Sequence, residues 1–421
     1  MGATVIVPSI DIVAGRTVQL VGGEKQALDA GDPVAVLDRF SVAGEVAVVD
    51  IDAARGEGDN SEIVTDLCSR ALIRVGGGIR SVERAVHWLD AGAAKVVIGT
   101  AADERLLSGL PADRVVVALD ARHGEVVTHG WRQGSGRDLL DSITRFRGLC
   151  GGFLVTFVER EGRLGGTDLD MARRVVDAAG SSRVTIAGGI TDAGEIAELD
   201  RIGADAQVGM ALYTGRLSLG EAVAAPLQSD RPDGLWPTIV VDEHGVALGM
   251  AWSSPESLRQ AVATRRGVYQ SRSRGLWVKG ETSGATQELL RADLDCDRDT
   301  LRFTVRQRDG FCHTGSRTCW GEDKGLARLA RRLGAIATAR PAGSNTVKLL
   351  DDTALLDAKL GEEVAELSTP GANIASEAAD LLYFALVKSV AAGVTLEEIE
   401  AILDGRERRV GRRPMESKEV E

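Results

Sequence analysis

Residues 1–226 contain one arrangement of aspartate and glycine residues twice. Each copy has an aspartate, a Gly-Gly-Ile run and a later single glycine: Asp11, Gly77-Gly78-Ile79 and Gly99, then Asp120, Gly188-Gly189-Ile190 and Gly209. Corresponding positions lie 109, 111 and 110 residues apart. A repeat whose period is half of the segment indicates two fused copies of one structural unit. The first half of the chain must therefore adopt a fold that two similar halves can form.

Over the same residues, short runs of valine and isoleucine alternate with segments whose apolar residues recur at helical spacing. Eight runs are predicted to be β-strands: residues 5–10, 46–51, 72–75, 95–98, 115–119, 154–158, 184–187 and 206–208. Eight strand–helix units predict a (βα)8 barrel, the TIM-barrel architecture. The repeat then corresponds to two fused half-barrels.

The repeated glycines directly follow predicted strands, at the end of a barrel where active sites lie. A glycine lets backbone N–H groups approach a phosphate without a Cβ in the way. Tight turns alone would explain one glycine pair, but two symmetric clusters favour a ligand with a phosphate at each end. The expected phosphate-binding residues are Gly77, Gly78, Arg80, Gly99, Thr100, Gly188, Gly189 and Gly209.

Residues 294–320 combine three of the chain's five cysteines with three closely spaced aspartates. Thiolates suit zinc, and three protein ligands leave a fourth position for water; these ligands are Cys296, Cys312 and Cys319. Clustered carboxylates suit magnesium, here from Asp295, Asp297 and Asp299. Strand alternation would point Asp295 and Asp297 away from Cys296. Buried thiols beside a solvated acidic turn are the alternative to these two metal sites.

The C-terminal part of the chain has a helical pattern. Apolar residues at helical spacing predict a helix over residues 354–367, and a second helix is expected over residues 374–392. Acidic residues gather on both helices: Glu362, Glu363, Glu366, Glu377 and Asp380. Like charges at i and i+4 repel unless a cation lies between them. A magnesium site is therefore expected here in preference to a solvated acidic face.

Charge and composition restrict the partners. The net charge of −12 argues against nucleic-acid binding, which needs clustered lysine and arginine. The cysteine usage indicates a reducing cytoplasm, and Asp11 within the first apolar run is not typical of a signal peptide. No uninterrupted apolar run reaches the roughly 18 residues of a membrane span. We expect a cytoplasmic protein that acts on small phosphorylated molecules, without nucleic-acid or membrane partners.

The predicted domain boundaries follow from composition. Residues 228–237 are polar and contain two prolines, which predicts a linker. Residues 238–252 predict a β-hairpin with its turn at residues 243–245, and residues 300–306 predict another strand. We expect a multidomain chain: a barrel over residues 1–226, a small β-rich zinc domain over residues 230–323 and an all-α domain over residues 324–421.

The motifs PSIDIVAGRTVQLVGG, VVDIDAARG, VGGGIRS, ALDARHGEVVTHGW and VGMALYTG resemble the ProFAR isomerases of histidine biosynthesis. The resemblance implies an Amadori rearrangement with Asp11 as general base, Asp120 as general acid and Thr156 as a supporting hydroxyl. Two features depart from the family: Glu161-Gly162-Arg163 replaces an Asp-Gly-Thr-like loop, and the helix within residues 100–111 is short. A barrel without catalysis, or one that also accepts phosphoribosylanthranilate, remains the alternative.

The motifs YQSRSRGLWVKGETSG, DCDRD and CHTGSRTCW resemble phosphoribosyl-AMP cyclohydrolase, although Gln270 stands where the family usually has Trp. The resemblance implies the zinc and magnesium sites, and a homodimer with zinc ligands from both chains. Its expected substrate contacts are Lys279, Thr282 and Ser283. His313, beside a metal-binding cysteine, is either a proton shuttle or a structural histidine.

The motifs KLGEEVAEL, EAADLLYF and RRVGRRP resemble phosphoribosyl-ATP pyrophosphohydrolase, with Lys348 and Lys359 as expected phosphate contacts. A housekeeping nucleotide pyrophosphohydrolase is the alternative for this segment. The three resemblances name neighbouring steps of one pathway. We therefore predict a trifunctional histidine-biosynthesis enzyme that hydrolyses phosphoribosyl-ATP to phosphoribosyl-AMP and diphosphate, opens the adenine ring to give ProFAR, and isomerises ProFAR to PRFAR.

Overall fold

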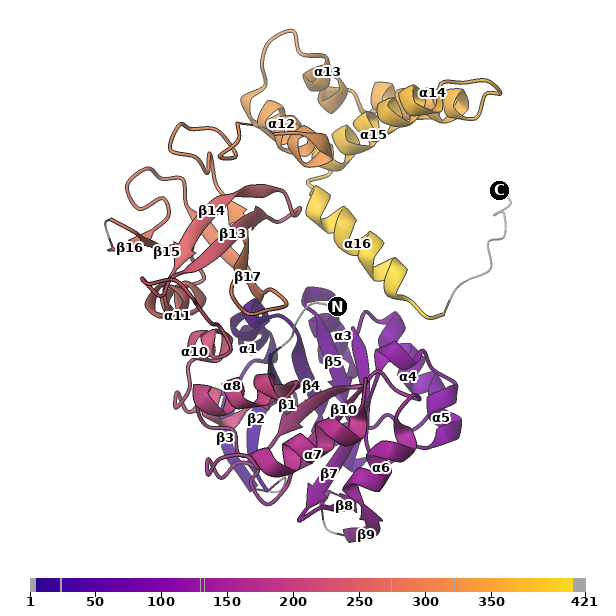
Figure 1. Cartoon of the computed structure of the whole chain (residues 1–421). Helices are drawn as coiled ribbons and strands as arrows, with labels where there is room; N and C mark the ends of the chain where they lie inside the picture. Colours follow the sequence, from indigo (N-terminus) through magenta and orange to yellow (C-terminus); the bar gives the residue numbers. More distant parts are fainter. Residues whose placement is uncertain are drawn as a thin grey trace. The chain divides into compact units, whose positions relative to one another are not determined.

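The computed structural model describes residues 5–22, 25–128, 130–131, 133–273, 275–321 and 323–411. The chain divides into two compact units. The first contains the described residues of Met1–Phe311 and Arg408–Glu421, and the second is Cys312–Glu407. The first unit holds a barrel and a smaller β-sheet, and the second is helical (Figure 1).

Eight parallel strands form a closed barrel, as predicted. They are β1 (Ile6–Val13), β4 (Val46–Asp50), β5 (Ile73–Gly76), β6 (Lys95–Ile98), β7 (Val115–Arg122), β10 (Gly152–Phe157), β11 (Arg183–Ala187) and β12 (Ala204–Val208). Neighbouring strands pair in the order β1-β4-β5-β6-β7-β10-β11-β12, and β12 pairs with β1 to close the ring. These strands are buried on both faces, which explains their continuous apolar sequences.

Two further antiparallel strands follow the first barrel strand of each half-barrel. Strands β2 (Arg16–Val21) and β3 (Lys25–Gly31) follow β1, and strands β8 (Glu125–Thr128) and β9 (Gln133–Asp138) follow β7. The repeat seen in the sequence therefore includes these strand pairs as well as the glycines.

Helices surround the barrel, and acidic or hydroxyl side chains cap most of them at the N-terminus. They are α1 (Pro33–Phe40), α2 (Ile51–Arg55), α3 (Ser61–Arg70), α4 (Val82–Asp90), α5 (Glu104–Ser108), α6 (Leu139–Phe146), α7 (Leu169–Ala179), α8 (Ala193–Arg201), α9 (Met210–Tyr213) and α10 (Leu219–Ala224). The short 3₁₀ helix η1 (Ser41–Ala43) precedes β4. Helix α5 has only five residues, so the predicted short helix is confirmed.

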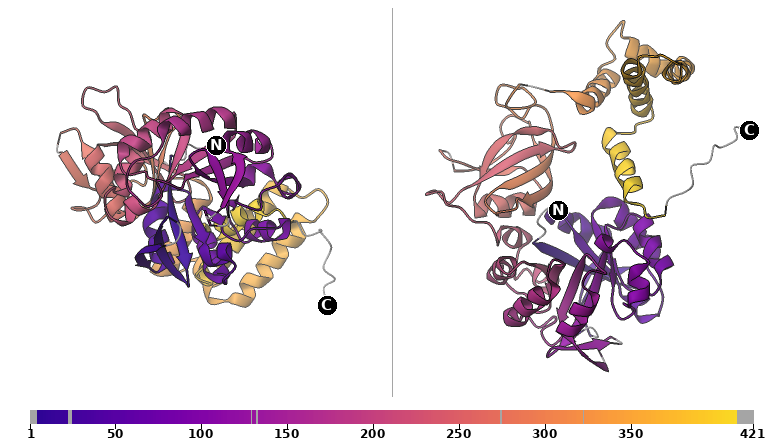
Figure 2. Two further views of the ribbon diagram at one scale, coloured as in Figure 1. Left: turned by 90° about the horizontal axis from the view of Figure 1, so that it is seen from below. Right: turned by 45° about the vertical axis from the view of Figure 1, so that its right-hand side comes forward.

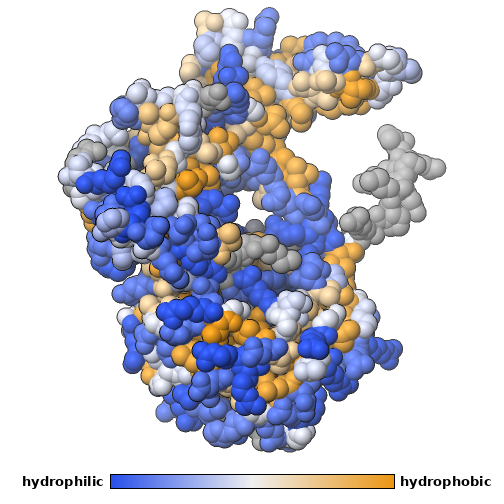
Figure 3. All heavy atoms as spheres, in the orientation of Figure 1, coloured by the Kyte–Doolittle hydropathy of each residue, from blue (hydrophilic) through white to orange (hydrophobic). Residues whose placement is uncertain are grey.

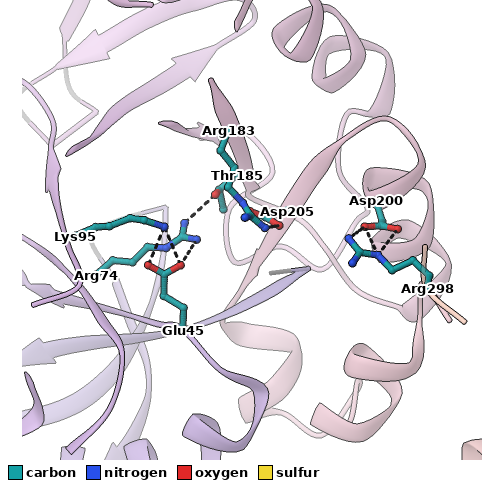
Figure 4. Close-up of polar contacts among 8 residues, drawn as sticks. All are labelled: Glu45, Arg74, Lys95, Arg183, Thr185, Asp200, Asp205 and Arg298. Carbon is teal, nitrogen blue, oxygen red and sulfur yellow. Dashed lines mark hydrogen bonds and ion pairs between the residues drawn. The ribbon is translucent and has the colours of Figure 1, made fainter. Parts of the chain in front are cut away.

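A layer of charged side chains lies at the N-terminal ends of the strands (Figure 4). Arg74 on β5 donates to Glu45 at 2.8 Å and to Thr185 on β11 at 2.8 Å. Lys95 on β6 lies 3.2 Å from Glu45. Arg183 and Asp205 form a second pair, with Nη2–Oδ1 at 2.8 Å. Burial acts to raise the pKa of Glu45, but the two cations outweigh it and the pKa lies below its usual value.

The middle of the chain forms a four-stranded sheet, which is most visible in the right-hand view of Figure 2. Its order is β14 (Ala247–Ser253), β13 (Trp236–Asp242), β18 (Leu301–Gln307) and β17 (Gln287–Leu294). Helix α11 (Pro255–Thr264) and the hairpin of β15 (Val268–Ser271) and β16 (Gly275–Val278) complete it. The predicted hairpin is confirmed, whereas the last two residues of the predicted linker belong to β13.

This sheet packs against the end of the barrel opposite its mouth. The contacts pair η1 with β17, and α10 with α11. The guanidinium of Arg265 donates to the carbonyl of Asp38 at 2.5 Å. Helix α10 approaches α11 so closely that a Cβ added to Gly220 would lie 2.6 Å from the Cα of Arg259. Barrel and sheet therefore form one compact unit.

The second unit contains the helices α12 (Gly325–Ala339), α13 (Asn345–Asp351), α14 (Thr353–Leu367), α15 (Ile374–Ala391) and most of α16 (Leu396–Arg408). Its buried core is small: Leu333, Leu349, Leu356, Leu386 and Val387. Apolar side chains are exposed on α14, α15 and α16, among them Val364, Ile374 and Ile402. Figure 3 shows hydrophobic surface, in orange, over this helical part of the chain. Among the described residues, no single helix meets the length and apolarity of a membrane span, although the bent pair α15–α16 meets them jointly.

Candidate functional sites

The mouth of the barrel presents the two predicted acids on different strands. Asp11 lies in β1, and burial raises its pKa to about 7. Asp120 lies in β7 directly opposite Thr156 of β10 in the strand register. Burial raises the pKa of Asp120, while hydrogen bonds from the side chains of Trp131 and Thr156 act in the opposite direction. The hydrogen bond from Thr156 therefore favours the charged form of Asp120, and its supporting role in catalysis stays a prediction.

A third acid at the mouth was not among the predicted site residues. Burial, and then the negative charges of Asp11 and Asp120, together raise the pKa of Glu161 to about 7. The sequence showed this residue only as a departure from an Asp-Gly-Thr-like loop. The signal that could have identified it is that glutamate keeps the carboxylate of the family's aspartate on a side chain one methylene longer.

Tyr213 also lies beside Asp11 and was not predicted. Its hydroxyl donates to the carbonyl of Ser9 at 2.9 Å, two residues before Asp11 on β1. Burial and then the charge of Asp11 raise the pKa of this tyrosine. The ring packs edge-on against Phe40 with centroids 5.3 Å apart. Tyr213 therefore fixes the backbone of β1 next to the acid.

The glycine pairs have a clear structural requirement in both halves. Gly77 has a φ of +100°, and an added Cβ would lie 2.1 Å from the carbonyl oxygen of Asp50. Gly188 has a φ of +98°, and its Cβ would lie 2.6 Å from the carbonyl oxygen of Phe157. Gly78 and Gly189 are restricted in the same way. Tight packing thus accounts for both pairs, and phosphate binding by them stays a prediction.

Gly99 and Gly209 differ in their surroundings. Among the described residues other than its chain neighbours, none has an atom within 4 Å of a Cβ added to Gly99, which lines a cavity together with Thr100, Asp120 and Arg137. A Cβ on Gly209 would lie 2.6 Å from the side-chain oxygen of Gln19. The cavity therefore places one glycine of the first half, Gly99, beside Asp120, an acid at the mouth. Arg80 instead donates to the carbonyl of Ala54 at 2.9 Å, at the end of α2.

The acidic residues of the DCDRD motif converge. Carboxylate oxygens of Asp295, Asp297 and Asp299 lie within 4.8 Å of one another. The prediction that they lie on a strand is wrong, because β17 ends at Leu294 and these residues form the turn before β18. A carboxylate oxygen of Asp295 accepts the amides of Asp299 at 3.1 Å and Thr300 at 3.2 Å. Burial acts to raise the pKa of Asp295, and these hydrogen bonds hold it below its usual value.

The three cysteines are free thiols, and no metal-ligand cluster of the described residues includes one. Cys296 is exposed in the first unit, whereas Cys312 and Cys319 begin the second. Hydrogen bonds, first from Thr314, lower the pKa of the Cys312 thiol to about 7. The ring of His313 lies 3.7 Å from that sulfur. Cys312 therefore supplies thiolate, the form that binds metal, near neutral pH.

The expected substrate contacts of the middle segment lie around the start of β17. Lys279 is buried, with its ammonium 5.5 Å from the ring centre of Phe311. Thr282 and Ser283 are exposed in the connection to β17. The Ser283 hydroxyl accepts the amide of Ala285 at 3.3 Å. Gln270, which replaces the family's Trp, accepts the hydroxyl of Ser254 at 3.3 Å.

The second acidic cluster bridges two helices. Glu363 and Glu366 on α14 and Glu377 on α15 bring carboxylate oxygens within 4.8 Å of one another. Burial and then the neighbouring acids, Asp380 included, raise the pKa of Glu363. Glu377 has a raised pKa for the same reasons, with a hydrogen bond to Glu366. A divalent cation would relieve this repulsion.

The remaining predicted residues of this segment lie outside the cluster. The carboxylate of Glu362 accepts a hydrogen bond from the ammonium group of Lys359 at 2.6 Å. Lys348 is exposed on α13. Residues 412–414 of the RRVGRRP motif lie outside the described residues.

Three protein-family profiles match successive segments of the chain. The family profile described as Histidine biosynthesis protein matches residues 5–218. The profiles for phosphoribosyl-AMP cyclohydrolase and phosphoribosyl-ATP pyrophosphohydrolase match residues 249–321 and 326–407. Both of these latter families use metal ions.

Three relatives illustrate the similarity. A histidine biosynthesis trifunctional protein from Neurospora crassa is 40% identical over 81% of this chain and 38% of its own length. The histidine biosynthesis bifunctional protein his7 from Schizosaccharomyces pombe is 45% identical over 48% of this chain and 49% of its own length. An imidazole-4-carboxamide isomerase from Methanoregula boonei is 38% identical over 52% of this chain and 98% of its own length. The matched part of the chain thus covers about half or less of the length of each fungal relative and nearly the whole length of the isomerase. It belongs to the histidine biosynthesis protein family, with a phosphoribosyl-AMP cyclohydrolase segment and a phosphoribosyl-ATP pyrophosphohydrolase segment after its barrel.

Proposed function

We propose that this chain carries out three consecutive steps of histidine biosynthesis on phosphoribosyl nucleotides. It would release diphosphate from phosphoribosyl-ATP, open the adenine ring of phosphoribosyl-AMP and isomerise the resulting ProFAR to PRFAR. The observation that carries the proposal is the presence, in one chain, of three matched segments that belong to one pathway. The functional clusters fall within these segments.

For diphosphate release, Glu363, Glu366 and Glu377 would hold Mg²⁺, with Asp380 close by. The raised pKa values of Glu363 and Glu377 support this assignment, because a cation between the carboxylates restores their charged forms. The ion neutralises phosphate charge. Lys348 and Lys359 would contact the phosphates, and Glu362 would orient Lys359 through their ion pair.

For ring opening, Cys296, Cys312 and Cys319 would hold Zn²⁺, and Asp295, Asp297 and Asp299 would hold Mg²⁺. The lowered pKa of Cys312 fits a zinc ligand, which must be thiolate. A zinc ion held there would supply a water nucleophile that is activated near neutral pH. His313 would carry the proton, while Lys279, Thr282 and Ser283 would bind the substrate.

We further propose a homodimer in which each zinc site takes its thiolates from both chains. The match of residues 249–321 to the phosphoribosyl-AMP cyclohydrolase family supports this arrangement. Light scattering of the purified chain tests the dimer. Five free thiols also suit a reducing cytoplasm as the place of action.

For isomerisation, Asp11 would act as general base and remove the C2′ proton after ring opening of the ribose. An acid must first protonate the ribose ring oxygen. Asp120 is the acid predicted from the sequence, and burial raises its pKa even though hydrogen bonds from Trp131 and Thr156 act in the opposite direction. We propose Glu161 as a second candidate donor, because its pKa of about 7 leaves it close to half-protonated at neutral pH and the charges of Asp11 and Asp120 favour its protonated form. The glycines at the strand ends, with Thr100, would bind the two phosphates.

The test is incubation of the purified chain with phosphoribosyl-ATP, Mg²⁺ and Zn²⁺, followed by identification of every product. PRFAR and diphosphate in equal amounts are expected. A reaction that stops at ProFAR would indicate a barrel without catalysis. Hydrolysis of many nucleoside triphosphates but not phosphoribosyl-ATP would overturn the assignment of the helical unit.

A further inference from the structure

The acidic turn between β17 and β18 is anchored to the barrel by one of its own residues. Arg298 reaches Asp200 near the C-terminal end of α8, with Nη2–Oδ1 at 2.7 Å and Nε 3.2 Å from both carboxylate oxygens (Figure 4). Only 14% of the arginine side chain and 17% of the aspartate side chain are exposed. A two-pronged, largely enclosed contact of this kind fixes both position and orientation.

Arg298 also forms hydrogen bonds with backbone groups, one of them within the turn itself. Its other nitrogen, Nη1, donates to the carbonyl of Asp295 at 2.9 Å, and its own carbonyl accepts the amide of Gln228 at 2.8 Å. Arg298 has a φ of +65°, a conformation that is unfavourable for a residue with a Cβ. These contacts therefore maintain a backbone shape that the turn would not adopt by itself.

That backbone shape is what gathers the carboxylates. Asp295 is both the residue whose carbonyl Arg298 holds and the residue whose carboxylate accepts the amides of Asp299 and Thr300. With Arg298 in place, three like charges come within 4.8 Å of one another before any cation is bound. Their mutual repulsion favours a more open turn, so a brace from outside the turn is needed.

We propose that Asp200 is a positioning residue which, through Arg298, holds Asp295, Asp297 and Asp299 in the arrangement that binds a divalent cation. The barrel thus preorganises the metal-binding turn of the neighbouring cyclohydrolase segment, in addition to its own chemistry. The effect on metal binding rests on the proposed magnesium site, whereas the bracing itself does not.

Hydrogen exchange of the full chain without metal tests the bracing. Asp200→Asn and Arg298→Gln should each speed exchange of the Asp299 and Thr300 amides about tenfold. Asp200→Glu, which keeps the carboxylate, should restore part of the protection. The matched control is Glu198→Gln on the same helix, which removes an exposed ion pair with Arg201 and should leave both amides unchanged. Unchanged exchange in both Asp200→Asn and Arg298→Gln, with native melting curves, would overturn the bracing.

Manganese titration by electron paramagnetic resonance tests the consequence for the metal. The titration uses full chains that also carry Glu363→Gln and Glu377→Gln, to silence the helical cluster. Loss of one site in Asp297→Asn identifies binding at the turn, and Asp200→Asn should weaken that site about tenfold. Equal affinity in Asp200→Asn and its parent would overturn the positioning role. If Asp297→Asn removes no site, the magnesium assignment fails instead, and hydrogen exchange still decides the bracing.

Discussion

At the scale of single residues, the barrel mouth favours the protonated form of its carboxyl groups near neutral pH, whereas the same groups in water would be ionised. Asp11 and Glu161 both have a pKa of about 7, far above that of an exposed carboxyl. Such groups can accept or donate a proton at neutral pH. The same environment lowers stability, because an ionised carboxylate is unfavourable where water is excluded.

The stability cost of Asp11 has a definite dependence on pH. Its folded pKa lies above the ordinary value of 3.8, so its favourable contribution is complete below pH 4 and is lost as pH rises to about 7. Asp11→Asn should therefore gain stability over wild type by roughly 1.4 kcal/mol per pH unit within that window, and abolish isomerisation. Urea denaturation at pH 5 and pH 8 measures the difference. Asp170→Asn, at a fully exposed position, is the control, and an equal gain at both pH values would contradict the burial of Asp11.

The choice of acid separates Glu161 from Asp120. Glu161→Gln should lower isomerase turnover at least about 100-fold, and the loss of activity above pH 7 should disappear from the remaining activity. The reason is that only a protonated Glu161 can donate to the ribose oxygen. Steady-state rates on ProFAR between pH 5 and pH 9 provide the measurement, with Glu198→Gln as control. If Asp120→Asn alone changes the alkaline limb, the acid is Asp120.

At the scale of elements, the charged layer links strands from both half-barrels. Arg74→Met would leave Glu45 buried beside a single, partly exposed lysine. Loss of one partner of a buried pair costs about 3–5 kcal/mol, whereas replacing both is often neutral. Urea denaturation should therefore show that Arg74→Met lowers the free energy of unfolding by about 3–5 kcal/mol. The double variant Arg74→Met with Glu45→Gln should have a free energy of unfolding close to that of the wild type. Arg302→Ala, which removes an exposed pair with Asp293, should change it by less than about 1 kcal/mol.

The elements that the sequence predicted correctly are those with a strong local pattern. The barrel strands, such as Val46–Asp50, are buried on both faces and read as continuous apolar runs. Strand β3 (Lys25–Gly31) is largely exposed and has no such run, so it was not predicted. The acidic residues after Leu294 alternate like a strand, yet hydrogen bonds to Asp295 close them into a turn.

The candidate sites divide in the same way. Asp11, Asp120 and the acidic clusters carry motifs that can be read in order along the chain. Glu161 was missed because its significance depends on two acids more than 40 positions away in sequence. Local periodicity also cannot pair Arg298 with Asp200, which lie 98 positions apart.

At the scale of the whole molecule, the barrel and the sheet share an interface at the end of the barrel away from its acids. Among the described residues, the barrel–sheet contacts given above come from α1, η1, α8 and α10 and not from the loop of Glu161. Each reaction should accordingly be separable by a single substitution.

That separation can be tested on two metal sites. Glu363→Gln should stop diphosphate release from phosphoribosyl-ATP but still open the ring of supplied phosphoribosyl-AMP. Cys319→Ser should release diphosphate and accumulate phosphoribosyl-AMP, because the variant would lose one of the three thiolates proposed to hold zinc. Product analysis by liquid chromatography and zinc content by atomic absorption give the readouts. A folded variant that loses both activities would show that the sites depend on each other.

The contact between Asp200 and Arg298 joins two residues that a ribosome synthesises at different times. A ribosome adds about 5–20 residues per second, so α8 is synthesised roughly 5–20 s before the arginine that must meet it. The turn can thus close onto a surface that has already emerged, and its unfavourable backbone conformation is captured when it forms. A cyclohydrolase segment translated without the barrel ahead of it would have to find that conformation unaided.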